Sequence, residues 1–433
     1  MTLLLFTGCY AQAADEPALP AEIDQGEKLP PAAPDTAVST DESRDPAPLE
    51  PRGTPDETPL PVMKPAPPTE PAVVQLEPRE ERASFQILGV RIRPGTTRRV
   101  AWSASQSFAG MPVSTPVLVA HGTSPGPVLC LTAAIHGDEL NGIEIVRQVF
   151  FEIQPTELSG TVVGVPIVNL HGFYRGSRYL PDRSDLNRFF PGDANGNAGS
   201  RIAHSFFQKV IRHCDLLVDL HTGSFFRTNL VQLRADLKHP DVLEFIKDFG
   251  AITVLQSDGE HGTLRRAASE AGIPAVTLEA GEPHRLQQEE VALGVKALKS
   301  LLRNRQMIHS YAFWRGPQPV FYESVWVRTS SGGILMSAVA LGDRVSLGDT
   351  LGTVTDPITN MRTVIESPVA GRILGMAVNQ VVMPGFAAYR VGVETVAVEN
   401  IPDTFDEVSS DQHEEPAPPL GGDGPVEVEE RPE

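Results

Sequence analysis

The sequence is short of positive charge, and this shortage narrows the classes of protein that it can encode. Its 433 residues hold 36 lysines and arginines against 55 aspartates and glutamates, which gives a formal net charge of −19 at pH 7. A nucleic acid is a polyanion that needs a basic face, so the composition argues against nucleic-acid binding. An anionic small molecule is still a candidate ligand, because a few local arginines can bind one.

Long apolar runs are also missing. Apart from a short apolar run at the start of the sequence, no stretch approaches the length and apolar character needed to span a bilayer. The short run Leu3-Leu4-Leu5-Phe6 precedes Ala11-Gln12-Ala13, which resembles a signal-peptidase site. We therefore expect residues 1–13 to be a signal segment and the protein to be exported to the periplasm. The alternative is a lipoprotein, since Phe6-Thr7-Gly8-Cys9 resembles a lipoprotein cleavage box that would tether the chain to a membrane through Cys9.

Aromatic residues are absent from residues 14–83, which consist largely of proline, alanine, acidic residues and threonine. Such a segment cannot bury enough apolar area to offset its chain entropy, so we expect a disordered spacer. Residues 401–433 predict a second disordered, acidic tail. The middle of the chain has an ordinary globular composition, with enough residues for one large core.

Cysteine is scarce, with three in the whole chain. Cys130 and Cys214 lie in or beside apolar segments, and neither has the spacing of a metal ligand. We expect two buried free thiols. A disulfide is the alternative in an exported protein, if the two segments are neighbouring strands.

One stretch carries metal-ligand chemistry. The apolar run Pro127–Leu131 reads as a buried strand, and His136 and Glu139 follow where that strand ends. A second apolar run ends in the same way at His221. Two imidazoles and a carboxylate can hold one zinc ion and leave a position for water. A His-x-x-Glu pair alone is weak, because many such pairs are surface loop residues.

The order of predicted elements indicates an α/β fold. Alternating residues between 85 and 119 predict antiparallel strands that lead into the sheet. A strand, a helix with Ile143, Val146, Val149 and Phe150 on one face, and a further strand then form a βαβ unit. We expect a mixed, mostly parallel sheet flanked by helices on both faces, with strands near 127–131, 161–168, 215–220, 251–255 and 274–278 and helices near 142–153 and 200–214.

Four motifs occur in an order that resembles the succinylglutamate desuccinylase and aspartoacylase family, a branch of the zinc carboxypeptidases. They are His136–Gly142, Asp185–Arg188, Asp219–Gly223 and Thr277–Gly281. The likeness covers roughly residues 84–399. It implies a zinc hydrolase domain at residues 84–314 that holds one zinc ion per chain through His136, Glu139 and His221.

The segment from Asn169 to Pro191 is long and rich in arginine, and long loops of this kind are usually functional. Arginine can pair both oxygens of a carboxylate at once. The resemblance implies that Asn187 and Arg188 bind a substrate carboxylate and that an upstream arginine polarises the scissile carbonyl. We assign the second role to Arg178, with Arg175 and Arg183 as alternatives.

Glu279 follows the apolar run Ile273–Leu278 at the mouth of the predicted sheet. A carboxylate in such a place is costly unless it is paired or used, and by position it resembles the family's general base. Glu282 is the nearby alternative. Asp219 lies two residues before His221 on one strand face, where it can orient that imidazole or satisfy backbone donors.

Residues 315–400 change to short strands divided by glycines, which resembles the all-β barrel-sandwich module of lipoyl and biotinyl carriers. A carrier needs a lysine at the hairpin tip, and Thr355–Asn360 has none. We therefore expect a structural cap.

Together these features predict a zinc-dependent hydrolase that cleaves an amide bond of an N-acyl amino acid or a similar carboxylate-bearing small molecule or short peptide. Two alternatives are an exported metallocarboxypeptidase or amidase that acts on cell-wall peptides, and a non-catalytic metal-binding relative. The sequence leaves the acyl group, the amine and the oligomeric state open.

Overall fold

A computed structural model describes residues 82–103, 114–309, 320–378 and 380–395. All of these described residues belong to one compact unit. The predicted signal segment with Cys9, most of the predicted spacer and the acidic tail lie outside the described residues. Within the described ranges, no helix has both the length and the apolar character needed to cross a bilayer.

A sheet of twelve strands forms the centre of this unit, in the order β13-β16-β18-β11-β9-β8-β10-β7-β5-β6-β4-β3. Its strands in chain order are β3 (Thr96–Ser103), β4 (Ser114–His121), β5 (Ser124–Ala133), β6 (Ser159–Val165), β7 (Leu216–His221), β8 (Arg227–Ala235), β9 (Thr253–Gln256), β10 (Ala275–Gly281), β11 (Val320–Arg328), β13 (Arg344–Val345), β16 (Gly371–Ala377) and β18 (Ala387–Thr395). The hairpin of β1 (Phe85–Ile87) and β2 (Val90–Ile92) precedes it.

The sheet is mixed, as the sequence predicted, but a predominance of parallel pairing is not confirmed. Parallel pairing runs through β10, β7, β5 and β6, and it also joins β8 to β9 and β9 to β11. The pairs β3–β4, β4–β6 and β8–β10 are antiparallel, as are those among β11, β18, β16 and β13. The hairpin β3–β4 enters before the first helical crossover, and β8 runs back against β10, so parallel order is limited to the middle.

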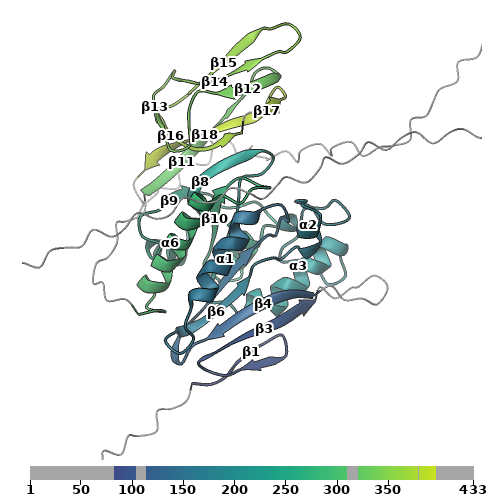
Figure 1. Cartoon of the computed structure of the whole chain (residues 1–433), viewed down its shortest axis with the longest axis vertical. Coiled ribbons are helices and arrows are strands. Elements are labelled where there is room, and N and C mark those ends of the chain that lie inside the picture. The colour runs from purple at the N-terminus through teal and green to yellow at the C-terminus, as the bar shows by residue number, and fades with distance from the viewer. Residues whose placement is uncertain (1–81, 104–113, 310–319, 379, 396–433) are drawn as a thin grey trace, which may run out of the picture. The chain divides into compact units, whose positions relative to one another are not determined.

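Helices cover both faces of the sheet, which confirms the α/β prediction (Figure 1). One face packs against α1 (Leu140–Glu152), α4 (Pro240–Lys247) and α6 (Gln288–Asn304), and the other against α3 (Ala198–Lys209) and α5 (Leu264–Glu270). The buried stripe of α1 contains Ile145, Val146, Val149 and Phe150. The predicted stripe was therefore nearly right, with Ile145 inside in place of Ile143.

The parallel strands bring three chain segments to one edge. In the register of β5 and β7, Ala133 pairs with Leu220, and in that of β7 and β10, His221 pairs with Glu279. Parallel neighbours end on the same side of a sheet, so the loops after these strands lie together. The residues singled out in the sequence lie at this edge.

The prediction of free thiols was wrong, because Cys130 and Cys214 form a disulfide. Cys130 lies on β5 and Cys214 lies just before β7, which is the parallel neighbour of β5 although 84 residues separate the two cysteines. Their Cα atoms are 5.7 Å apart, and both residues are buried. Neither cysteine lies among the candidate metal ligands.

The described residues 320–395, here called the C-terminal β region, consist of two antiparallel layers. One layer is β11, β13, β16 and β18 of the large sheet, and the other is β12 (Gly333–Ser337), β14 (Thr350–Thr355), β15 (Arg362–Glu366) and β17 (Gln380–Val382). Both layers contribute to one apolar core. Strand β16 also pairs with β8, so this region is hydrogen-bonded into the sheet that carries the site.

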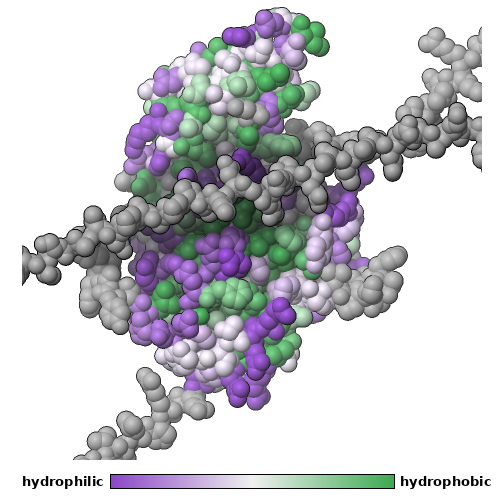
Figure 2. Space-filling view, viewed as in Figure 1, coloured by the Kyte–Doolittle hydropathy of each residue, from purple (hydrophilic) through white to green (hydrophobic). Residues whose placement is uncertain are grey.

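The outer layer of this region leaves apolar side chains in solvent. Figure 2 shows apolar and polar residues mixed over its surface, and Ile334, Met336, Val364 and Val381 of the outer layer are all more than 40% exposed. At the β14–β15 turn the Asp356 carboxylate accepts hydrogen bonds from the backbone N–H groups of Ile358 and Thr359. The turn that would carry a lysine in a carrier module is thus held by an aspartate.

Candidate metal centre

The loop after β5 sets the position of His136 and Glu139. It packs so closely on the short helix α2 (Leu170–Tyr174) that a Cβ on Gly137 would lie 2.0 Å from the carbonyl carbon of Gly172. Only glycine fits at such an approach, so the loop and its neighbour His136 are fixed. Glu139 occupies the N-cap position of α1, where the helix dipole favours a carboxylate, although its side chain makes no capping hydrogen bond.

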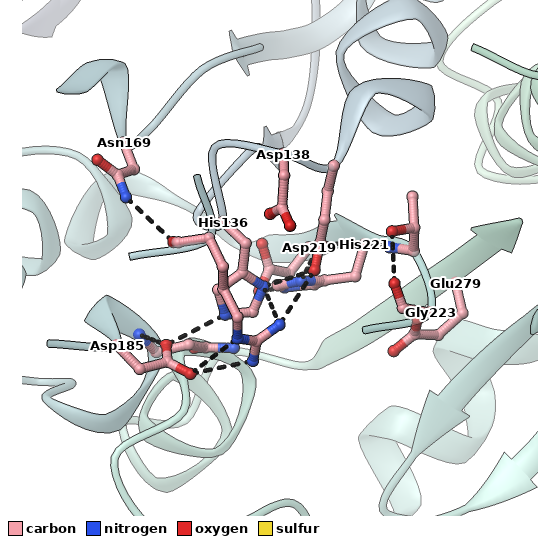
Figure 3. A network of polar contacts seen from close by, with 12 residues as sticks. His136, Asp138, Asn169, Asp185, Asp219, His221, Gly223 and Glu279 are labelled. Carbon is pink, nitrogen blue, oxygen red and sulfur yellow. Dashed lines mark hydrogen bonds and ion pairs between the residues drawn. The ribbon is translucent and has the colours of Figure 1, made fainter. Parts of the chain in front are cut away.

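Three side chains from two distant segments converge at this edge, and Figure 3 labels two of them, His136 and His221. Nδ1 of His136 lies 2.7 Å from Oε1 of Glu139, and Nδ1 of His221 lies 2.9 Å from Oε2 of the same carboxylate. One ligand atom from each residue lies within 4.8 Å of the others, and all three residues are buried. The structure therefore brings together the set that the sequence singled out.

A carboxylate holds the other nitrogen of each imidazole. Nε2 of His221 lies 2.8 Å from Oδ2 of Asp219, and Nε2 of His136 lies 3.1 Å from Oδ1 of Asp185. These acceptors hold a proton on Nε2, so the Nδ1 atoms, which both face the carboxylate of Glu139, are the nitrogens that a metal could take. Asp219 thus has the orienting position that was expected as one of two alternatives, and Asp185 has the same role for His136.

The charges around this point favour a cation. Burial alone would raise the pKa of Glu139, but His136 and His221 hold it far below its usual value. Burial lowers the pKa of His221, yet Asp219 and Glu139 raise it well above the ordinary value. The carboxylates of Glu139, Asp185 and Asp219 are thus balanced by the two imidazoles and the guanidinium of Arg178. A divalent cation bound through both Nδ1 atoms would replace the two protons that the imidazoles share with Glu139 and would keep this balance.

Arg178 lies against the cluster. Its Nη1 is 3.2 Å from Nδ1 of His136 and 3.4 Å from Oε1 of Glu139, and its Nη2 donates to Oδ2 of Asp185 at 3.0 Å. Phe225 stacks on the guanidinium at 5.2 Å. Arg178 is 9% exposed, whereas Arg175 and Arg183 are both exposed. Of the three arginines weighed from the sequence, only Arg178 is inside the site.

Asn187 and Arg188 lie in a 3-10 turn, η2 (Leu186–Arg188), beside the cluster. Oδ1 of Asn187 accepts a hydrogen bond from the first backbone N–H of α5 at 2.8 Å, which aims its amide nitrogen away from that helix. Arg188 is partly exposed and pairs with Glu260 at 3.2 Å. The pair is thus placed at the rim of the centre, next to Asp185.

Glu279 lies beside His221 on the neighbouring strand and is 4% exposed. Its Oε2 accepts a hydrogen bond from Nδ2 of Asn229 at 3.0 Å, and its Oε1 pairs with Nη1 of Arg234 at 3.2 Å. The alternative, Glu282, pairs with the exposed Arg285 and lies past the end of β10. Because Glu279 pairs in register with His221, it is a better candidate for the general base than Glu282.

Several residues that shape the site were not singled out from the sequence. Asn141 donates to the carbonyl of Ala280 at 2.9 Å and accepts from the N–H of Gln287, so it ties the start of α1 to the end of β10. Asn229 and Arg234 belong to β8, which the sequence pattern did not predict. The signals available were the motif membership of Asn141 and the β-prone run Thr228–Leu233.

Comparisons with known proteins agree with the geometry. Residues 125–305 match the family model of the succinylglutamate desuccinylase/aspartoacylase catalytic domain. The chain is also 28% identical, over 246 residues, to an N-alpha-acetyl-L-2,4-diaminobutyric acid deacetylase of Halomonas elongata, covering 53% of this chain and 71% of that protein.

Among solved structures, a succinylglutamate desuccinylase/aspartoacylase of Rhodobacter sphaeroides superposes with a TM-score of 0.62 at 22% identity, over 69% of this chain and 96% of that one. The product-bound ectoine utilization protein EutE (DoeB) of Ruegeria pomeroyi also gives a TM-score of 0.62, at 23% identity, over 72% of this chain and 96% of that one. These two likenesses establish the fold.

Proposed function

We propose that the protein is a zinc-dependent hydrolase of the succinylglutamate desuccinylase/aspartoacylase family that deacylates N-acyl amino acids, because residues 125–305 match the model of that family's catalytic domain. The observation that carries the proposal is the convergence of His136, Glu139 and His221, in which Nδ1 of each imidazole faces the carboxylate of Glu139. The C-terminal β region would be the barrel-sandwich cap of this enzyme.

The donor set suits zinc. Two imidazole nitrogens and one carboxylate oxygen form a common set for catalytic zinc, and one divalent ion per chain would replace the two protons that the imidazoles share with Glu139. Zinc bound there supplies a water of lowered pKa and a polarised carbonyl. Asp185 and Asp219 would keep the ligating imidazoles in the correct tautomer.

The remaining chemistry falls to side chains of this chain. Glu279 accepts the proton of the attacking water on its carboxylate and passes it to the departing amine, so the C–N bond breaks without releasing an anion. Arg178 offers fixed N–H donors and a positive charge to the developing oxyanion. Asn187 and Arg188 bind the free carboxylate of the substrate, which fixes the amide relative to Glu279.

The substrate class follows from these donors and from the relative. The Halomonas elongata protein is named a deacetylase of an N-acetylated diamino acid. For this chain we propose the same class of substrate, a small N-acyl amino acid with a free carboxylate. The acidic surface charge is no obstacle, because Arg178 and Arg188 provide the local positive charge.

We also propose that the protein works outside the cytoplasm. The Cys130–Cys214 disulfide supports this, because buried disulfides are rare in reducing compartments. The apolar start of the sequence and its signal-like site support export as well. Fractionation of cells that express the full chain would test the proposal, and a wholly cytoplasmic protein with reduced cysteines would contradict it.

An exported enzyme with this site has a second candidate function, the trimming of cell-wall peptides as a carboxypeptidase or amidase. The disulfide is the observation that favours it, since it supports an extracytoplasmic site of action. The two functions use the same residues and differ in the amine that leaves. Product analysis of both substrate classes with the same enzyme separates them.

The test is a deacylase panel with purified full-length protein. N-acetyl and N-succinyl amino acids and muropeptides are incubated with the zinc-loaded, the chelated and the zinc-restored protein. We expect hydrolysis of N-acyl amino acids that is lost with chelator and restored by zinc. Glu279→Gln should keep zinc and lose turnover by about 100- to 10,000-fold. Zinc binding without turnover on either class would favour a non-catalytic relative.

A further inference from the structure

Both oxygens of Glu279 are held by strand β8. Asn229 donates to Oε2 at 3.0 Å, and Arg234 pairs with Oε1 at 3.2 Å. Because Glu279 is 4% exposed, water competes little for these contacts. The two partners approach different oxygens, so together they fix the rotation of the carboxylate. A group that transfers a proton needs a fixed orientation, and small misplacements cost rate.

A β-bulge brings Asn229 to this position. Along the β8–β10 ladder, Glu279 pairs with Gln232, but Gly281 pairs with Asn229. Regular antiparallel pairing would place Leu230 opposite Gly281, so β8 contains one extra residue here. The bulge therefore turns the amide of Asn229, and not the side chain of Leu230, toward the face that carries Glu279.

The other edge of β8 at this point belongs to the C-terminal β region. Strand β16 pairs with β8 so that Gly375 lies opposite Asn229. A Cβ on Gly375 would be 2.6 Å from Oδ1 of Asn229, closer than such atoms approach. The backbone of Gly375 is not in the left-handed region, so glycine is required here for space and not for conformation.

A second contact between β8 and β16 lies beside Glu279. Gln232, which is directly opposite Glu279 and fully buried, directs Nε2 toward the carbonyl oxygen of Leu374 at 3.4 Å. Asn229 and Gln232 of β8 thus contact consecutive residues of β16, Gly375 and Leu374.

From these contacts we infer that Asn229 and Gly375 are positioning residues, and that the C-terminal β region holds the proton-transferring carboxylate in place. Gly375 keeps the space in which the amide of Asn229 fits, and Asn229 holds Oε2 of Glu279. The inference rests on the proposed function, because it takes Glu279 as the group that moves the proton. It gives the C-terminal β region a part in catalysis beyond that of a cap.

The experiment uses full-length, zinc-loaded protein and the best N-acyl amino acid from the panel. The variants are Asn229→Ala, Gly375→Ala and the double variant. Gly332→Ala is the matched control, because it adds the same methyl to the same region, where the nearest atom is Cδ of Pro384 at 3.2 Å. For each protein, kcat, KM and zinc content are measured.

Loss of a hydrogen bond to a charged group corresponds to about 10- to 100-fold in rate. We expect this loss in kcat for Asn229→Ala and for Gly375→Ala, with KM and zinc content unchanged. The control should remain close to wild type. Because Gly375 acts through Asn229, the double variant should be no slower than Asn229→Ala alone.

Additive losses in the double variant, a loss that falls on KM or zinc content, or an equal loss in the control would overturn the inference. If Gly375→Ala does not fold, Asn229→Ala decides alone, and an unchanged kcat in that variant overturns it. If the wild-type protein is active and Asn229→Ala has the same kcat, this inference is wrong but the proposed function stands. If the wild-type protein hydrolyses no substrate, the proposed function is wrong, and this inference falls with it.

Discussion

Replacing Asp219 with asparagine is a direct test of the metal centre. Oδ2 of Asp219 lies 2.8 Å from Nε2 of His221, and its Oδ1 accepts a hydrogen bond from the Thr132 hydroxyl at 2.7 Å. The side chain is 1% exposed. Asparagine has the same shape and can face both partners, with its carbonyl toward the imidazole and its amide toward the hydroxyl. The change therefore removes one negative charge and little else.

The size of the effect can be worked out in two ways. A hydrogen bond to a charged group contributes about 1.5–3 kcal/mol and a neutral one about 0.5–1.5 kcal/mol, so keeping the bond without its charge should cost about 1–1.5 kcal/mol. Mutation of the partner of a ligating imidazole typically weakens metal binding by about 10- to 100-fold, which is about 1.4–2.8 kcal/mol. The two ranges meet near their common bound, so we expect the Kd for zinc to rise about 10-fold in Asp219→Asn.

The assay is competition for zinc against a chromophoric chelator at fixed pH. Asp215→Asn is the matched control, because Asp215 lies at the opposite end of β7, where its Oδ2 accepts from the backbone N–H of Val128. That variant should bind zinc as wild type does. Wild-type affinity in Asp219→Asn, or an equal loss in Asp215→Asn, would refute the assignment of His221 as a ligand held by Asp219.

Two further outcomes are expected. Arg178→Ala should lower kcat about 100- to 1000-fold, because it removes a donor to the oxyanion, whereas Arg175→Ala and Arg183→Ala should stay near wild type. Steady-state kinetics of the three variants on one substrate would show the difference. Equal losses of kcat in all three would contradict the role of Arg178. Replacing Cys130 and Cys214 together by serine should lower the free energy of unfolding by about 2–4 kcal/mol in urea denaturation with the Kd for zinc unchanged, and unchanged stability would argue against the disulfide.

The position of the centre could be read from the sequence because its ligands follow apolar strands. The candidate ligands His136 and Glu139 lie in the loop after β5, and His221 is the last residue of β7; both strands are apolar enough to be buried in a sheet. The ends of parallel strands meet at one edge, so residues far apart in the chain could be placed together. The orienting role of Asp219 followed from strand periodicity, which puts it on the same face as His221.

Contacts between strands that are not consecutive in the chain could not be predicted from the sequence. The disulfide depends on β5 and β7 being neighbours, and nothing in the spacing of Cys130 and Cys214 reveals that pairing. The choice of Arg178 over its rivals needed the path of a long loop, where exposure of each side chain is set by tertiary packing. Strand β8 was missed because buried polar residues, Asn229 and Gln232, interrupt its apolar pattern.

Strand β8 is bordered on one edge by two partners in succession, β9 for its last residues and β16 for its first. Strand β9 in turn pairs with β11. Cutting the chain after α6 would strip neighbours from both strands and leave rows of unsatisfied amide and carbonyl groups open to pairing with other molecules. We expect a protein shortened in this way to aggregate, so the catalytic part and the C-terminal β region should fold together.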